Sequence, residues 1–387
     1  MSRTVTVPAA SRGWLVAVGA AGLAAGCVSI TARPEAPPAA PSSQPTAASI
    51  STPAPTPAPD PAGLKVPASI DATGSTDVAA QLQSFIDGAP NGSTIVFRAG
   101  GTYRLDSALR LRGKRNVTLE GNGAQLRIEG TTGRSGSSGI IVENYSENAT
   151  IRNLTLVGNN QEAGTSAACC SREGQHGIAV FGSTNTLIED VEIRRVWGDC
   201  VYVNATAPGI WADGVTFRDS TCRLTGRHGV GIIAGKHLRI ERVVFDEIGF
   251  MVVDIEPGVS HEGASDVIIR DNTVGTYGLT DALVPWLLEA AGAAGSVVRD
   301  VTVTGNTVAG NRDGYSGAVL GLNIKVIGED KVRAGFTVTD NTARSTASGP
   351  VMYFSQVDGV TVTGNVQPLS SGPLASFPGS TSVTYRP

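Results

Sequence analysis

Short segments in which apolar and polar residues alternate recur along the chain from about residue 94 onward. The clearest form is a six-residue phrase, Val-Thr-Val-Thr-Gly-Asn at 301–306 and at 360–365, with Val-Thr-Leu-Glu-Gly-Asn at 117–122. Alternation with a period of two is typical of a β-strand, and the Gly-Asn ending is typical of a turn. The repeat predicts parallel strands stacked in at least nine coils over residues 94–385. Weaker copies of the phrase end at Leu154, Val191, Val215, Val243, Asn272 and Asn341.

The sixth position of the phrase changes along the chain, because it is asparagine in the last four copies, at Asn272, Asn306, Asn341 and Asn365. If this position points inward, successive side-chain amides can hydrogen-bond to one another up the stack. The alternative is that the four asparagines lie in ordinary exposed turns.

One segment near the start of the repeat has helical spacing instead. Its apolar residues recur at i, i+4, i+7 and i+8, at Val78, Leu82, Phe85 and Ile86. Asp77 precedes this segment as a capping residue, and Gly88 closes it. We therefore predict a helix over residues 77–87. It would cover the apolar end that the first coil of a solenoid exposes.

The composition supports a β-solenoid. Glycine accounts for 48 of 387 residues, whereas aromatic residues make up only 5%. Many tight turns joined by small apolar residues suit such a fold, and they suit a helical bundle badly. The net charge of -4 and the pI near 5.7 provide no basic surface for nucleic acid. We therefore expect an all-β domain that does not bind nucleic acid, and we expect it to be a monomer.

The N-terminus predicts export. Residues 1–26 begin with positive charge and continue into the apolar stretch Trp14–Ala25, which is too short to span a bilayer. The stretch runs into Leu-Ala-Ala-Gly-Cys27, which resembles the lipobox of bacterial lipoproteins. The resemblance implies lipid on Cys27 and anchoring on the outer side of the bacterial cell membrane. The alternative is an ordinary secretory signal peptide and a secreted protein.

The rest of the chain divides into two parts. Residues 27–63 are rich in proline, alanine, serine and threonine, and this composition predicts an extended tether. Residues 64–387 hold the repeat and form the single folded domain. Under this interpretation the protein contacts the membrane only through its lipid anchor.

A separate short strand precedes each of the later phrases, and these strands can be aligned with one another by their alternating apolar pairs. The alignment brings several titratable residues into one column. These inward pairs are Ile178/Val180, Val201/Val203, Val230/Ile232 and Val253/Ile255. The residues two positions before each pair then form one column, His176, Asp199, His228 and Met251. Tyr202, Asp254 and Glu256 point outward beside them, at about one strand spacing from their neighbours. The alternative is that the column residues only finish turns, with hydrogen bonds to the backbone.

The opening of the folded part resembles pectate-lyase-like β-helix proteins. The similar segments are Asp-Ala-Thr-Gly-Ser-Thr-Asp at 71–77, Thr-Ile-Val-Phe at 94–97 and Ala-Gly-Gly-Thr-Tyr at 99–103. The resemblance implies a single-stranded right-handed parallel β-helix over residues 64–387. It implies a reaction type only weakly, because this fold hosts lyases, hydrolases, epimerases and binding proteins.

Two further segments are similar to motifs of the polygalacturonase family. They are Gly-Asp-Cys-Val at 198–201 and Arg-His-Gly-Val-Gly-Ile at 227–232. The resemblance implies that Asp199 is the general acid and that His228 supports it. The first aspartate of the family's pair is replaced by Gly198, so Asp254 or Glu256 would supply the second carboxylate.

The other catalytic hypothesis for the outward face that carries Asp254 and Glu256 is a calcium-dependent lyase. Asp254 and Glu256, two positions apart on one strand, could bind Ca²⁺, which takes oxygen ligands. In lyases of this fold such a cation neutralises the uronate of the substrate. Arg227, Lys236 or Lys325 would then act as base or charge clamp, with Lys325 in a faint counterpart of the family's Arg-Ile-Lys motif. The alternative is that Asp254 and Glu256 form a solvated strand face.

These observations predict an exported carbohydrate-active protein that cleaves an acidic polysaccharide, as hydrolase or lyase, on the outward face of its first parallel sheet. The alternatives are a non-catalytic surface protein that binds polysaccharide and a glycan epimerase. We expect the substrate to contact His176, Trp197, Tyr202 and Lys325, and the catalytic group to comprise Asp199, Arg227, His228, Asp254 and Glu256. An exported protein permits disulfides, but the sequence leaves the pairing open among Cys169, Cys170, Cys200 and Cys222.

Overall fold

The computed structural model describes residues 62–130, 138–161, 172–279, 286–308, 321–343, 352–367 and 374–386. The predicted signal peptide, Cys27 and nearly all of the tether lie outside the described residues. Residues 58–387 belong to one compact unit. No helix in the described part of this unit has the length and apolar character that a membrane span requires.

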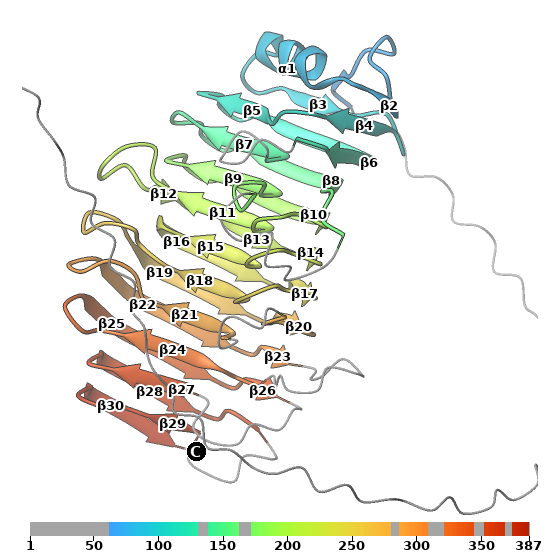
Figure 1. Ribbon diagram of the computed structural model, residues 1–387. Helices are drawn as coiled ribbons and strands as arrows, with labels where there is room; N and C mark the ends of the chain where they lie inside the picture. The colour runs from blue at the N-terminus through green and yellow to red at the C-terminus, as the bar shows by residue number, and fades with distance from the viewer. Residues whose placement is uncertain are drawn as a thin grey trace, which may run out of the picture. The chain divides into compact units, whose positions relative to one another are not determined.

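Parallel strands stacked in coils make up this unit, and Figure 1 shows them following one another in chain order. One sheet has ten strands in the described residues, so the prediction of at least nine coils is confirmed. The fold is a right-handed parallel β-helix, as predicted. The strands of this ten-stranded sheet are β5 (Leu109–Arg112), β7 (Ile140–Glu143), β9 (Ile178–Phe181), β11 (Val201–Asn204), β15 (Val230–Ile232), β18 (Val253–Ile255), β21 (Leu288–Ala290), β24 (Ile324–Ile327), β27 (Met352–Ser355) and β29 (Ala375–Ser376).

The remaining strands form a second, bent sheet, which supplies the other walls of the coils. Its strands pair in parallel with those of the neighbouring coils, as in β10 with β8 and β19 with β22. They are β1 (Leu64–Lys65), β2 (Thr73–Asp77), β3 (Thr94–Val96), β4 (Thr102–Leu105), β6 (Thr118–Ile128), β8 (Thr150–Val157), β10 (Leu187–Arg194), β12 (Ala212–Asp213), β13 (Thr216–Arg218), β14 (Thr221–Arg223), β16 (Ala234–Glu241), β17 (Val244–Asp246), β19 (Gly263–Arg270), β20 (Thr273–Val274), β22 (Val297–Thr304), β23 (Thr307–Val308), β25 (Val332–Thr339), β26 (Thr342–Ala343), β28 (Asp358–Thr363) and β30 (Thr381–Arg386).

The six-residue phrase marks a corner of each coil. Its fifth residue has a left-handed backbone, as at Asp190 (φ 51°), Asp271 (φ 56°) and Gly305 (φ 66°), which Gly, Asn and Asp tolerate best. The sixth residue then points into the coil. One predicted copy was misplaced: the corner is Asp219 and the buried sixth residue is Ser220, five positions beyond Val215. An alternating stretch continues across this corner, so alternation alone did not locate it.

The first copy, at 117–122, is also displaced. Asn122 itself has a left-handed backbone (φ 52°), and the register between β6 and β8 shifts between Glu120 and Ala124. Ala124 therefore pairs with Leu154 and takes the inward position.

The core follows the predicted inward pairs. Val201 is in register with Ile178 and with Val230, and Val230 is in register with Val253. Val180, Val203, Ile232 and Ile255 all have exposed fractions of 2% or less, so the predicted register is confirmed.

The four asparagines do point inward, and they form a ladder. The Nδ2 of Asn272 donates to Oδ1 of Asn306 at 2.9 Å, Asn306 donates to Asn341 at 2.8 Å, and Asn341 donates to Asn365 at 2.8 Å. All four side chains are buried. The prediction of stacked amides is confirmed, and the exposed-turn alternative is wrong.

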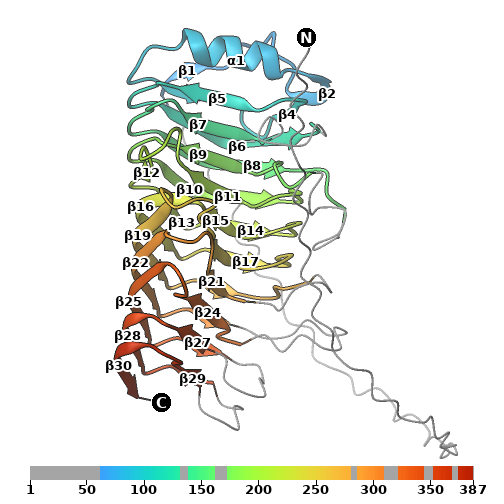
Figure 2. The same ribbon diagram turned by 60° about the vertical axis from the view of Figure 1, so that its left-hand side comes forward.

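Helix α1 (Ala79–Gly88) lies at the N-terminal end of the stack of coils, as Figure 2 shows. It begins two residues later than predicted, because Val78 takes the N-cap position. Asp77 still serves the start of the helix, since its Oδ1 accepts the N–H of Ala79 at 3.0 Å. Leu82 and Ile86 are buried against the first coils, which confirms the capping role.

One disulfide joins Cys200 to Cys222, with Cα atoms 5.9 Å apart. Cys200 precedes β11, and Cys222 lies on β14 near the end of the coil that β11 begins. Both side chains are fully buried, so the bond closes this coil across its interior. The sequence did not reveal this pairing, because the two cysteines lie on different walls of the coil. Cys169 and Cys170 lie outside the described residues.

Candidate functional site

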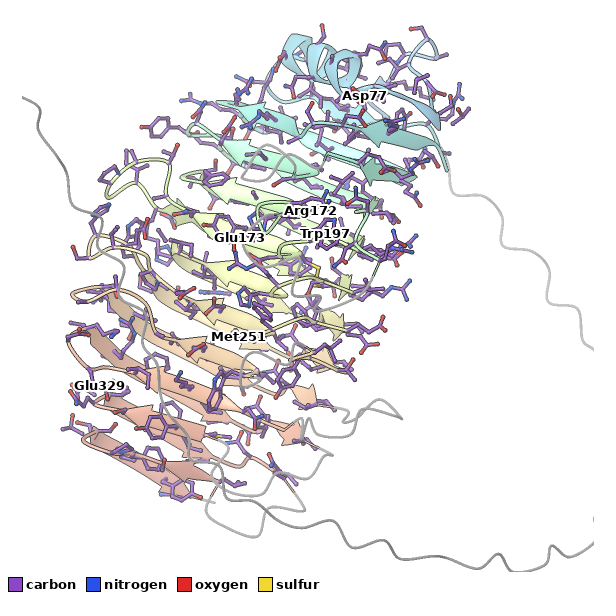
Figure 3. All side chains as sticks on the ribbon, in the orientation of Figure 1. Asp77, Arg172, Glu173, Trp197, Met251 and Glu329 are labelled. Carbon is purple, nitrogen blue, oxygen red and sulfur yellow. A yellow bond between two sulfur atoms is a disulfide. The ribbon has the colours of Figure 1, made fainter. Side chains whose placement is uncertain are left out.

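An outward row of side chains crosses the ten-stranded sheet. Strand register places Tyr202, Gly231, Asp254, Glu289 and Lys325 side by side on β11, β15, β18, β21 and β24. Because adjacent parallel strands lie about 4.8 Å apart, each residue of the row is within side-chain reach of the next. Figure 3 shows Arg172, Glu173, Trp197 and Met251 over these middle coils.

The predicted titratable column stands at the start of the same strands. The N–H of Asp199 donates to Nδ1 of His176 at 3.1 Å, and the N–H of His228 donates to Oδ1 of Asp199 at 3.0 Å. The N–H of Met251 donates to Nδ1 of His228 at 3.3 Å. The residues are neighbours, as predicted. The turn-finishing hydrogen bonds of the alternative are present as well, so these bonds alone do not mark a functional site.

One side-chain atom of the column, Oδ2 of Asp199, accepts no backbone hydrogen bond of this kind. Oδ2 of Asp199 is buried and has no hydrogen-bond partner among the described residues. Nδ1 of His176 lies 3.4 Å from it, but this nitrogen already accepts the N–H of Asp199 and therefore carries no proton there. His176 therefore donates no hydrogen bond to Oδ2, and a buried carboxylate oxygen without a donor costs free energy.

Gly231 makes room for this carboxylate. A Cβ atom at Gly231 would lie 2.6 Å from Oδ2 of Asp199 and 3.3 Å from the ring of Tyr202. Any larger residue would therefore displace Asp199. The carboxylate of Asp199 occupies the gap in the outward row, one strand away from Asp254.

Asp254 is a buried carboxyl with a neutral partner. Its Oδ2 lies 3.2 Å from Nε2 of His228, and both side chains are almost completely buried. Burial raises the pKa of Asp254 well above its ordinary value, and the negative charges of Glu256, Glu289 and Asp199 raise it further. Burial also lowers the pKa of His228 to about 4, so the imidazole is neutral near pH 7. Asp254 therefore tends to hold a proton.

Asp199 has the opposite character. Burial alone would raise its pKa, but the charge of Arg227 and the surrounding column residues lower the pKa below the ordinary value. Nε of Arg227 lies 3.7 Å from Oδ1 of Asp199, and Nη1 of the same residue lies 3.4 Å from Oε2 of Glu173. Asp199 is thus ionised near neutral pH, whereas a general acid must hold a proton, so its role as the general acid stays a prediction.

Glu256 is the carboxyl on this face that solvent reaches, because its side chain is exposed. Partial desolvation raises the pKa of Glu256, whereas the nearby charge of Arg227 lowers it. Glu256 follows Asp254 by two positions and lies directly after the end of β18. The pair therefore combines one sheltered carboxyl and one accessible carboxyl.

The predicted substrate contacts separate into two groups. Tyr202 stacks on the imidazole of His176, with ring centroids 4.4 Å apart, and lies in the outward row. Lys325 lies in the same row two strands beyond Asp254, where its Nζ pairs with Oε1 of Glu289 at 2.7 Å. Trp197 is different: Nε1 donates to Asn159, and the guanidinium of Arg172 covers its ring at 4.7 Å. Its ring face is therefore already in contact with the protein.

A calcium site at Asp254 and Glu256 stays a prediction. No group of three or more His, Cys, Asp or Glu side chains in the described residues is arranged to hold a metal ion. Oδ2 of Asp254 already contacts His228, and Oε1 of Glu289 already contacts Lys325. Asp254 and Glu256 are therefore not assigned as metal ligands, and no step is derived through a metal.

Three residues of the site were missed in the sequence. Glu289 could have been found by extending the alternating alignment one coil further, to Leu288 and Ala290. Gly231 looked like an ordinary glycine, because only the packing shows which side chain leans over it. Glu173 lies in an irregular segment, where no periodic signal could locate it.

Comparison with known proteins gives a family and a fold. Residues 68–284 match the family described as rhamnogalacturonase A/epimerase, pectate lyase-like. No curated protein matches the chain. An alginate lyase from Paenibacillus sp. str. FPU-7 superposes with a TM-score of 0.50 at 15% identity, covering 79% of this chain and 97% of that one.

Two further solved structures are similar. The Agl-KA catalytic domain has a TM-score of 0.51 at 14% identity, covering 84% of this chain and 58% of that one. A family 28 exopolygalacturonase of Yersinia enterocolitica has a TM-score of 0.45 at 12% identity, covering 82% and 77%. At these identities the likeness concerns the fold alone.

Proposed function

We propose that this chain, which belongs to the rhamnogalacturonase A/epimerase, pectate lyase-like family, is a hydrolase that cleaves an acidic polysaccharide on the outward face of its ten-stranded sheet. The observation that carries the proposal is the pair Asp254 and Glu256. The two carboxyls share one strand face but have different environments, and such pairs divide the acid and base roles of glycoside hydrolysis.

In this proposal Asp254 is the general acid. Burial and the neighbouring negative charges raise its pKa, which favours the protonated carboxyl that a general acid needs. The proton passes to the glycosidic oxygen as the bond from that oxygen to the anomeric carbon breaks. Glu256 takes a proton from the water that adds to this carbon. One water is consumed and two hydroxyl groups are formed. Glu256 then releases its proton to solvent and Asp254 takes one up, which restores both groups.

Asp199 acts as a positioning residue in this proposal. Its negative charge raises the pKa of Asp254 and also that of Arg227. Arg227 is therefore held as a cation beside the carboxyl pair, although its side chain is mostly buried. A cation at this place suits a uronate carboxylate of the substrate, and Lys325 provides a second one further along the row.

The free Oδ2 of Asp199 supports the same view. A buried carboxylate oxygen without a partner is costly for folding, so its retention is more readily explained by a functional role than by stability. A bound water or a substrate hydroxyl above Gly231 would satisfy it.

The test is a panel of acidic and neutral polysaccharides, incubated with the wild-type protein and with Glu256→Gln and scored for two products. Hydrolysis predicts new reducing ends without ultraviolet absorption, and Glu256→Gln should lose at least about a hundredfold in rate. Absorption by unsaturated uronates would show elimination instead and would refute the hydrolase assignment. Absence of both products across the panel would favour the non-catalytic binding protein.

We also propose that the protein is exported and lipid-anchored through Cys27, on the evidence of the lipobox-like segment before it. Cys27→Ser should move the protein from the membrane fraction to the soluble fraction without changing its thermal unfolding. Equal membrane retention of the variant would contradict this anchor.

A further inference from the structure

A second hollow lies outside the candidate site, where strands of the ten-stranded sheet lead into the bent sheet. It has a volume of about 560 Å³, and its described lining includes Tyr145, Trp211, Asp213, Lys236 and His261. None of these residues takes part in the proposed hydrolysis.

The register of the coils explains how the hollow forms. Glu147, Thr184 and Asp213 are bridged to one another on three successive coils. Counting back two positions on each coil brings Tyr145, Gly182 and Trp211 into one row. Gly182 thus stands between two aromatic residues and lines the hollow. A Cβ atom at Gly182 would lie 2.6 Å from Cγ2 of Thr206, so Thr206 packs against this position. The polar row lies directly beside it.

Trp211 is a fixed aromatic surface. Its Nε1 donates to the carbonyl of His261 at 3.0 Å, and its ring edge would lie 3.0 Å from a Cβ at Gly263. The indole is half-buried, so one part of it remains open to solvent. An aromatic ring that is already ordered can stack on a sugar without the entropy cost of immobilising it.

Tyr145 is exposed to 56% at a backbone φ of 61°, in the left-handed region that bulky residues avoid. Packing does not explain this residue, because most of the ring faces solvent. Strain kept at an exposed aromatic residue points to a use in binding.

The charges of the hollow indicate the class of ligand. Lys236 is the only lysine or arginine in its described lining, and its Nζ pairs with Oδ2 of Asp213 at 3.2 Å. Nδ1 of His237 contacts the other oxygen of the same carboxylate at 2.6 Å. Glu147 adds a second carboxylate, which Arg115 approaches at 3.6 Å. No uncompensated cation is available for an anion, whereas carboxylates readily accept hydrogen bonds from hydroxyl groups.

We infer that this hollow, between Tyr145 and Trp211 and over Gly182, is a second saccharide site that binds a neutral sugar unit. The inference rests on the proposed function for the nature of the polymer. The site would hold a neutral branch or block of the acidic polysaccharide that is cleaved on the ten-stranded sheet. Only the segment 205–210 separates Trp211 from β11, which carries Tyr202.

The experiment measures binding by calorimetry in the Asp254→Asn background, so that no probe is cleaved. The probes are hexasaccharides of arabinan, galactan and xylan, with an oligogalacturonate as the acidic counterpart. We expect at least one neutral probe to bind. Trp211→Ala and Tyr145→Ala should each weaken it about tenfold, as expected for one lost aromatic contact. Trp211→Phe and Tyr145→Phe, which keep a ring, should retain most of the affinity.

The outcomes separate this inference from the proposed function. Neutral binding that depends on Trp211 supports the second site even if no polysaccharide is cleaved. The inference is wrong if wild type binds no neutral probe, or if Trp211→Ala and Tyr145→Ala leave the affinity unchanged. It is also wrong if Glu256→Gln weakens neutral binding as much as Trp211→Ala does. Thermal unfolding of each variant identifies any loss that is due to misfolding.

Discussion

Two columns of buried polar side chains run along the coils, and they differ in how completely their hydrogen-bonding atoms are used. In the asparagine ladder the Nδ2 of each of the first three members donates both to the next Oδ1 and to a backbone carbonyl, as Asn306 does to Asn341 and to Ile269. The Nδ2 of Asn365, the last member, donates to two backbone carbonyls. Oδ1 of Asn306 in turn accepts the N–H of Asn272 at 3.0 Å. The ladder is closed and neutral.

The column of His176, Asp199 and His228 uses the same device, a side-chain acceptor for the N–H of a neighbouring coil. It differs because it carries charge and leaves Oδ2 of Asp199 without a partner. A closed column contributes only stability, whereas an open column gives up stability and can bind or polarise something else. Under the proposed function, the ladder is structural and the titratable column supports catalysis.

The largest expected difference is in turnover, and it is tested at Asp254, the carboxyl of the outward row whose Oδ2 lies 3.2 Å from Nε2 of His228 in the titratable column. Asp254→Asn keeps the shape of the side chain and an oxygen for Nε2 of His228, but it removes the transferable proton. We expect the rate to fall between about a hundredfold and ten-thousandfold, with the free energy of unfolding nearly unchanged. Rates on a cleaved polysaccharide and chemical denaturation measure the two quantities.

Asn306→Ala is the matched variant in the ladder, and its rate per folded molecule should stay within about twofold of wild type, because it touches no group of the site. A wild-type rate for Asp254→Asn, or a large loss for Asn306→Ala, would remove the functional distinction between the two columns.

The second difference is in stability. Asn306→Ala takes away the acceptor of two buried donors, the N–H and the Nδ2 of Asn272. We expect a loss of about 3 kcal/mol in the free energy of unfolding, because buried donors without acceptors are costly. Asn148 is the exposed control, since its Nδ2 donates to Asn116 at 2.8 Å on the surface.

Asn148→Gly suits the left-handed backbone at that position (φ 55°). Water can replace the two hydrogen bonds that are lost, one donated to Asn116 and one accepted from Asn185. We expect it to cost less than about 1 kcal/mol. Equal losses in the free energy of unfolding for Asn306→Ala and Asn148→Gly would mean that burial is not what makes the ladder stabilising.

The sequence predicted the fold well because the β-helix depends on local signals that repeat. Alternating apolar residues gave the inward pairs around Val203 and Ile232, and the aligned strands then brought Asp199 next to His228. The misplaced copy at Val215 shows the limit of this signal. Alternation continues through Ser220, and only the backbone shows that the corner is at Asp219.

The chemistry of the site was less predictable. Which carboxyl holds a proton depends on burial and on charges from several coils, so Asp199 was taken for the acid although its pKa is lowered. Glu173 and the pairing of Cys200 with Cys222 depend on packing between different walls, which no period in the sequence encodes.

The third difference concerns pH. Burial lowers the pKa of His176 to about 4, whereas an unfolded histidine titrates near 6.5. Below about pH 6.5 His176 takes up a proton in the unfolded chain but stays neutral in the folded protein. The free energy of unfolding therefore falls as the pH decreases toward 4. His176→Asn keeps an acceptor for the N–H of Asp199 but cannot be protonated.

Between pH 7 and pH 5, wild type should therefore lose roughly 2 kcal/mol more than His176→Asn. Denaturation at both pH values tests this expectation. His261→Asn, at an exposed position, should behave as wild type. Ladder variants such as Asn306→Ala should keep the wild-type pH dependence, because amides do not titrate. Parallel pH curves for wild type and His176→Asn would show that the column does not exclude the proton.

The smallest effect concerns the row residue Glu289, which acts on the column only through its charge. Burial is the main reason that the pKa of Asp254 is raised, and the charges of Glu256 and Glu289 raise it further. Glu289→Gln should lower the pKa of Asp254. Because the general acid must be protonated, the rate then declines at a lower pH, by a few tenths of a unit to about one unit. Lys325→Met gives the opposite sign, since it leaves Glu289 without the cation that lies 2.7 Å away. Rates across the pH range should therefore place the alkaline limbs of the two variants on opposite sides of wild type. Shifts in the same direction would show that Glu289 acts through packing. Its charge would then not contribute to the raised pKa of Asp254.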